Sequence, residues 1–140
     1  MTNLVPLALQ IPWRQSVKIF PSSGLVTVAA GGSTNGNIAP SKIFALIASN
    51  NDTLAHDVIV GITDVANTFT ALGTVTIPIS AGYVGTTPSV NMLTGLLSLP
   101  LDETGMPFLF LNPTDLLQVK SLVALNTGRD IDIVCFGADF

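Results

Sequence analysis

The sequence predicts an all-β protein, a single-domain β-sandwich or jelly roll of about eight short antiparallel strands. Three observations carry this prediction. Nine prolines and 12 glycines are spread through the 140 residues, so few intervals between them can hold a helix of ordinary length. The intervals are rich in Val, Ile, Thr and Phe, which favour strands. Turn residues separate them at regular spacing.

The N-terminal half holds the first four expected strands. They cover Val17 to Phe20, Leu25 to Ala29, Lys42 to Ser49 and Asp57 to Thr63. The second and fourth divide into two faces by alternation, as strands do. The third run, KIFALIAS, is almost entirely apolar, which is expected of a strand covered on both faces. A buried helix is the alternative for that run.

The C-terminal half is less uniform. Strands are expected at Thr74 to Ser80, where Pro78 indicates an edge or a bulge, and at Phe108 to Leu111. The segment Val90 to Leu99 fits either a helical turn around Met92 to Leu96 or two short strands bent at Gly95. The runs Leu116 to Leu125 and Ile131 to Phe136 are predicted to form a hairpin around the loop at residues 126–130. No repeat, linker or second domain is visible, so residues 1–140 are expected to form one β domain.

Charge is scarce in this sequence. Only 10% of the residues are charged, with five Lys or Arg against nine Asp or Glu and a formal net charge of −4. A typical soluble domain is about 25% charged. High hydrophobicity argues against disorder, and five dispersed cations argue against a nucleic-acid partner. A weakly charged surface is easily desolvated, so we expect much of it to be buried against other subunits.

Neither a membrane span nor a leader is expected. The stretch from Val65 to Leu101 lacks charged residues but is interrupted by Pro, Gly and Asn, so no window is continuously apolar for a span. The N-terminus lacks a cationic region before its short apolar run, which argues against a signal peptide. The one cysteine, Cys135, cannot pair within the chain and fits folding in a reducing cytoplasm.

No catalytic, cofactor or metal site is predicted. His56 and Asp57 form the only His–carboxylate neighbours, and we expect both side chains to meet water where a turn enters a strand. Cys135 lies in an apolar run and is expected to be buried and unreactive. Asp130 and Asp132 are expected to pair with Arg129 or Lys120 across the hairpin; whether they bind a cation stays open.

The glycine-rich segment at residues 31–36 is predicted to be a flexible loop or an inter-subunit arm. It lacks the lysine and the following helix of a phosphate-binding loop. The segment around Trp13 is extended rather than helical in character, and Trp and Arg are enriched in interface hot spots. The sequence therefore predicts subunit or capsid contacts at Pro6, Ile11, Pro12, Trp13 and Arg14. The alternative is that Trp13 folds back on its own core.

Two segments resemble small virion proteins of tailed bacteriophages. The first is IASNNDTLAHDV, from Ile47 to Val58, and the second is LPLDETGMPFLFL, from Leu99 to Leu111, followed by the terminal GADF. The resemblance is to head decoration, or cement, proteins, and it covers the chain from Lys42 onward. It implies a β-sandwich or jelly roll, usually a homotrimer, on the capsid exterior. It also implies an extended N-terminal arm, here residues 1–15, that reaches onto the shell.

The expected function is therefore non-enzymatic. The chain would be a capsid decoration protein, made in the host cytoplasm, that stabilises the head by bridging neighbouring subunits of the major capsid protein, with no cofactor, nucleic acid or membrane. The alternative is a carbohydrate- or receptor-binding module of a phage fibre or head appendage, with Trp13 and Tyr83 as the aromatics with polar handles. A cupin-type enzyme would need several His ligands, and this chain has one.

Overall fold

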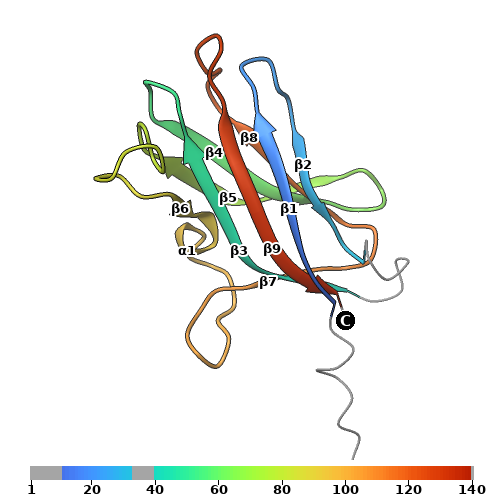
Figure 1. Ribbon diagram of the computed structural model, residues 1–140. Coiled ribbons are helices and arrows are strands. Elements are labelled where there is room, and N and C mark those ends of the chain that lie inside the picture. Colours follow the sequence, from blue (N-terminus) through green and yellow to red (C-terminus); the bar gives the residue numbers. More distant parts are fainter. Residues whose placement is uncertain (1–10, 33–39, 140) are drawn as a thin grey trace, which may run out of the picture.

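A computed structural model describes residues 11–32 and 40–139, which form two antiparallel sheets packed face to face (Figure 1). Sheet A, in front in Figure 1, contains in order β1 (Ile11–Ile19), β9 (Ile131–Asp139), β3 (Ser41–Asn50) and β6 (Val90–Asn91), with β7 (Leu109–Leu111) also paired to β3. Sheet B, behind it, contains in order β2 (Val26–Ala30), β8 (Leu116–Ser121), β4 (His56–Thr63) and β5 (Phe69–Ile77). The predicted β-sandwich is confirmed.

The path of the chain is that of a jelly roll. Apart from the β4–β5 hairpin and the β6–β7 segment, each connection between the described strands passes from one sheet to the other. β1 pairs with β9 in sheet A, and β2 pairs with β8 in sheet B, although the two strands of each pair are far apart in sequence. Such wiring produces the nested Greek keys that define the jelly roll.

This wiring corrects the predicted hairpin between the last two strands. β8 pairs with β2 and β4, whereas β9 pairs with β1 and β3, so the loop at residues 126–130 connects two sheets. The short loop and its glycine favour a hairpin between the two strands. The strands instead belong to different sheets, and each buries its apolar side against the opposite sheet. The buried residues of both sheets form one core. Its fully buried members include Leu46, Ile133 and Cys135 from sheet A and Val58 and Val60 from sheet B.

Several expected elements change length or type. The first strand is longer than the predicted Val17–Phe20, because all nine residues of β1 pair with β9. Residues 11–15 of the expected arm therefore lie in β1, and residues 1–10 lie outside the described residues. The KIFALIAS run is a strand, as predicted. The ambiguous segment Val90 to Leu99 contains the short strand β6 and one helical turn, α1 (Met92–Gly95), which Asn91 caps through its side chain.

Pro78 follows the last residue of β5, which is an edge strand of sheet B, as its missing N–H requires. Residues 33–36 of the predicted glycine-rich loop lie outside the described residues. Within residues 11–32 and 40–139, no helix has the length and apolarity needed to cross a membrane.

Candidate interaction surface

The outer face of sheet A carries a set of large apolar side chains at its surface. Ile133 and Cys135 of β9 point into the core, so their neighbours Val134 and Phe136 point outward. Cross-strand pairing places Arg14 and Ala45 on either side of Phe136, and Ser16 and Ile47 on either side of Val134. We call this surface the aromatic face. Its apolar members are Phe20, Phe44, Ala45, Ile47, Phe110, Val134 and Phe136.

The phenylalanines of this face are exposed to an unusual degree. Phe20 is 51% exposed, Phe44 44%, Phe110 50% and Phe136 36%. Phe44 projects because the register between β3 and β9 shifts between Ile43 and Ala45 and leaves it outside the ladder. The exposed face of a strand normally carries polar residues. This departure from the usual pattern makes the aromatic face the candidate contact surface.

A groove follows the seam between β1 and β9 along this face. It consists of three open hollows that share lining residues: Ser16 and Val134 line the first and second, and Arg14 and Phe136 line the second and third. Phe20 lies at one end and Phe44 at the other. The three hollows thus adjoin one another as a shallow groove, whose apolar side chains are interspersed with Arg14, Ser16, Lys18 and Asp132.

The aromatic face is also the cationic side of the protein. Arg14, Lys18 and Lys42, three of the five cations in the chain, lie on it. Lys42 places its Nζ 4.7 Å from the ring centroid of Phe108, which in turn packs edge-on against Phe110 at 5.3 Å.

Lys18 belongs to a polar network at one end of the face. It pairs with Asp132 and lies 3.6 Å from Asp130, while the hydroxyl of Tyr83 donates to Asp132. This hydrogen bond, with burial, raises the pKa of Tyr83 to about 12. Burial alone would raise the pKa of Asp132, but the bonds from Lys18 and Tyr83 outweigh it and hold that pKa below its usual value. The expected partners of these aspartates, Arg129 and Lys120, are therefore replaced by Lys18, because β9 pairs with β1 rather than β8.

The predicted contact residues divide between the two sides of β1. Pro12 and Arg14 point to the aromatic face, and Ile11 and Trp13 point to the other side. Pro6 lies outside the described residues. Trp13 packs against the core and covers Gly137, where a Cβ would lie 2.6 Å from the indole Cζ2.

The indole Nε1 of Trp13 donates to Asp139 Oδ1 at 2.7 Å, and the same oxygen accepts from the hydroxyl of Ser41. Trp13 thus takes the position described by the alternative, folded against its own core. That the five predicted residues contact another subunit or a capsid stays a prediction.

A buried polar cluster, which the sequence did not reveal, joins the ends of β4 and β8. His56 lies between Asp52 and Ser121, with its Nε2 2.7 Å from Asp52 Oδ2 and its Nδ1 3.2 Å from Ser121 Oγ. The exposed fractions are 0% for Asp52, 1% for His56 and 8% for Ser121. The expectation that His56 meets water is therefore wrong: the turn after β3 folds its aspartate over the ring. Asp57 is exposed, as expected.

This cluster resembles a Ser–His–Asp triad in composition but not in access. The hydroxyl of Ser121 donates to the carbonyl oxygen of Val123 at 2.6 Å, so its proton is directed away from His56. Asp52 also accepts from the backbone and side-chain nitrogens of Asn126, at 3.0 and 2.7 Å. Burial favours the neutral acid, but the hydrogen bonds from Asn126 and His56 hold the pKa of Asp52 well below its usual range. The cluster fastens the β3–β4 turn to the β8–β9 connection.

Cys135 is buried, as predicted, and burial raises the pKa of its thiol to about 12. Among the described residues, no group of three or more His, Cys, Asp or Glu side chains is arranged to hold a metal ion.

No protein-family model and no curated protein sequence matches the chain. Among solved structures, the chain is similar to the extra small virus virus-like particle of the giant freshwater prawn Macrobrachium rosenbergii. The similarity has a TM-score of 0.37 and 12% sequence identity, and it covers 100% of this chain and 87% of that chain. A likeness at this level does not assign the chain to a family.

Proposed function

We propose that the chain is a non-enzymatic structural subunit of a virus particle whose aromatic face is covered by neighbouring subunits. The observation that carries this proposal is the shallow groove along β1 and β9, lined by Phe20, Phe44, Val134 and Phe136. A monomeric soluble protein rarely keeps a contiguous apolar surface of this kind in water. Burial of this apolar surface against a neighbour stabilises the contact by about 25 cal/mol for each Å² removed from water.

In the finer form of the proposal, the chain is a decoration protein on the outside of a bacteriophage head, associated as a homotrimer and bound to the major capsid protein. Such a protein would resist internal DNA pressure by adding buried area between shell subunits. Firm interfaces bury more than about 1,000 Å². The low charge of the chain and its jelly-roll wiring, an architecture that capsid domains share with lectins and cupins, support this form.

The glycan-binding alternative gains no specific support. It would use aromatics whose polar groups are free to meet a sugar. The indole of Trp13 already donates to Asp139, and the hydroxyl of Tyr83 donates to Asp132. An enzyme built on the Asp52–His56–Ser121 cluster is not favoured either, because its serine is buried and its proton is engaged.

The test compares wild type with Phe44→Asp and Phe136→Asp by sedimentation velocity over a wide concentration range. We expect wild type to associate and both variants to sediment as folded monomers, with unchanged far-UV circular dichroism. A matched control, Thr74→Asp on the outer face of sheet B, should associate as wild type does. A dispersed wild-type monomer at high concentration would contradict the proposal.

The finer form needs a second measurement. Wild type should bind shells assembled from the major capsid protein of the same virus and raise their melting temperature, and Phe136→Asp should do neither. Saturable binding to a glycan array without affinity for such shells would favour the alternative function.

A further inference from the structure

We propose that the aromatic face receives the loop at residues 97–107 of a second copy of this chain, with Arg14 of one copy paired to Glu103 of the other. This inference rests on the proposed function, because it names the partner of the same face. It follows from two surfaces of one subunit that match in chemistry and that carry Arg14 and Glu103, whose side chains form no hydrogen bond or ion pair with one another or with the other described residues.

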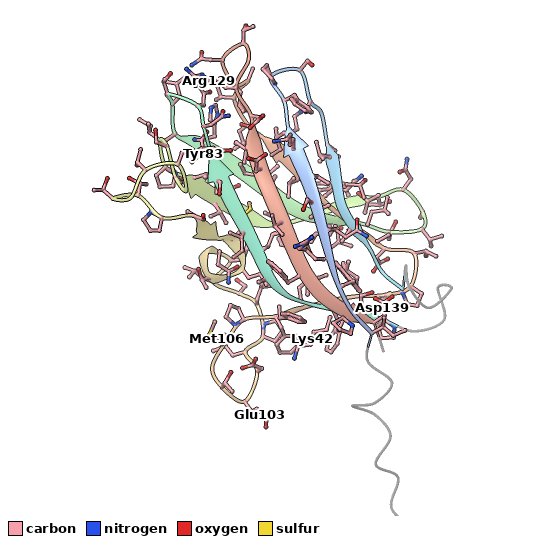
Figure 2. The ribbon with its side chains drawn as sticks, viewed as in Figure 1. Lys42, Tyr83, Glu103, Met106, Arg129 and Asp139 are labelled. Carbon is pink, nitrogen blue, oxygen red and sulfur yellow. The ribbon has the colours of Figure 1, made fainter. Side chains whose placement is uncertain are left out.

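The first surface is the loop that connects α1 to β7. It protrudes beyond the end of sheet A, and Glu103 lies at its far end, pointing away from both sheets (Figure 2). Three large apolar side chains of this loop are exposed: Leu97 is 92% exposed, Leu101 63% and Met106 49%. An apolar loop with a carboxylate at its tip suits a surface that is apolar and cationic.

The loop has a defined shape in the isolated subunit. Asp102 accepts hydrogen bonds from the backbone nitrogens of Thr104 and Met106, at 2.9 and 3.0 Å, and Leu101 forms a β-bridge with Pro107. Asp102 is thereby committed to the turn, whereas Glu103 is free to reach a partner. Because little chain entropy remains to be lost, a preformed loop of this kind docks at reduced cost.

Charge complementarity selects Glu103 among the carboxylates of the chain. All nine lie within the described residues, and Asp52 and Asp139 are buried. Most of the more accessible ones accept hydrogen bonds within the chain: Asp57 from Thr76, Asp64 from Thr68, Asp102 from Thr104, Asp115 from Asn112, and Asp132 from Lys18 and Tyr83. Asp130 accepts no hydrogen bond from the described residues through its side chain but forms an ion pair with Lys18 at 3.6 Å. Within residues 11–32 and 40–139, Glu103 is the exposed carboxylate with neither a hydrogen bond nor an ion pair.

The same reasoning selects Arg14 among the cations. Lys18 is ion-paired, Lys42 lies over the ring of Phe108, and Arg129 donates to the carbonyl of Asn51. Arg14 and Lys120 are the two cations with no such contact among the described residues, one on the outer face of each sheet. Arg14 lines the groove beside Phe44 and Phe136, which match Leu101 and Met106 of the loop.

A head-to-tail contact also avoids an electrostatic conflict. If two aromatic faces packed on each other, Arg14, Lys18 and Lys42 of both copies would lie in one interface, where Asp132 would be the carboxylate that balances them. Like charges held close together in an interface are energetically costly. A contact between two different surfaces instead repeats from copy to copy. Such contacts close into rings, including trimers, or continue as an open lattice.

The experiment is a charge exchange in the full chain, read by sedimentation velocity at low ionic strength. Arg14→Glu and Glu103→Arg are each expected to weaken self-association at least about tenfold, and the double variant is expected to recover most of the loss. Lys120→Glu is the matched control, because it changes the other unengaged cation by the same charge. It should leave association unchanged.

The outcomes separate this inference from the function it rests on. If Phe136→Asp gives monomers while both charge variants associate as wild type does, the aromatic face is used but the loop is not its partner, and the inference is wrong. The same conclusion follows if the double variant shows no recovery or if Lys120→Glu weakens association equally. A wild-type monomer would overturn both proposals. Circular dichroism on every variant checks that the fold is kept.

Discussion

The two sheets of this sandwich bury the same kind of core but present opposite outer faces. The outer face of sheet B is largely polar, and several of its groups pair with one another: Thr76 donates to Asp57 at 2.6 Å, and the side chain of Gln118 donates to Thr27 at 3.0 Å. The outer face of sheet A presents Phe44, Phe136 and their apolar neighbours, with Arg14 among them.

The aromatic side chain on the outer side of sheet B, Phe69, packs onto the sheet and is only partly exposed. Phe69 lies over Gly61, where a Cβ would be 2.4 Å from the ring Cζ. Phe44 and Phe136 on sheet A remain 44% and 36% exposed. The comparison teaches that the two outer faces differ in apolar exposure, and under the proposed function sheet A is the one that a second subunit covers. Changes near sheet B should therefore affect folding, and changes on the aromatic face should affect association.

The largest effect on folding is expected at the buried cluster where β4 and β8 end. Asp52→Ala removes the acceptor of His56, Thr53 and Asn126, and it leaves the buried His56 ring without its partner. Each hydrogen-bond donor left without its partner typically costs about 1–3 kcal/mol of unfolding free energy when it is buried, and Asp52 accepts from four donors, so this loss should exceed that of any other substitution considered below. Urea denaturation should show this loss, and an unchanged midpoint would mean that the cluster is not formed.

The same carboxylate predicts how stability changes in acid. The pKa of Asp52 in the folded protein lies below its ordinary value of 3.8, so folding favours the charged form. Its contribution is complete above that ordinary value and is lost as the pH falls through the folded-state pKa. The stability difference between wild type and Asp52→Asn should therefore shrink between about pH 6 and about pH 2. A difference that stays constant or grows in acid would contradict the assignment.

A smaller loss is expected where Phe69 covers sheet B. In Gly61→Ala, the new Cβ would meet the Phe69 ring and lie 2.5 Å from the carbonyl oxygen of Thr70, which is backbone and cannot rotate away. Overpacking of this kind typically costs about 1–3 kcal/mol. Gly85→Ala is the control, because a Cβ there meets nothing within 4 Å. Equal melting temperatures for the two variants would show that the close approach is absent.

These features differ in how far the sequence predicts them. Period-two patterns and turn residues located most strands because they are local signals. The sheet that each strand joins is not local, which is why β8 and β9 were paired wrongly. The burial of His56 depends on Ser121, 65 positions away, and on a turn whose fold the sequence leaves open.

One sequence pattern did indicate the aromatic face. The apolar run KIFALIAS predicted a strand covered on both faces, and β3 has only its inner face fully buried in the single chain. The second cover is then another subunit, as we propose. Sequence alone placed the contact on the segment around Trp13, because Trp and Arg are enriched in hot spots, and Pro12 and Arg14 of that segment do line the groove. It missed that alternation along β1 turns Trp13 toward the core and Arg14 toward the groove.

The smallest effect on folding is expected from exchanging one side chain on each outer face. Val134→Thr on sheet A and Thr74→Val on sheet B keep nearly the same shape and a β-branched residue, so each should change the unfolding free energy by about 0.5 kcal/mol or less. Their effects on association should differ. Val134 lines the groove, and a hydroxyl placed there must lose its water when a partner docks, so Val134→Thr should weaken association measurably. Thr74 lies on the outer side of sheet B, opposite Ile59, and its replacement should leave association as in wild type. Equal shifts in sedimentation for the two variants would mean that both outer faces meet a partner, and that the difference between the sheets is one of composition rather than of use.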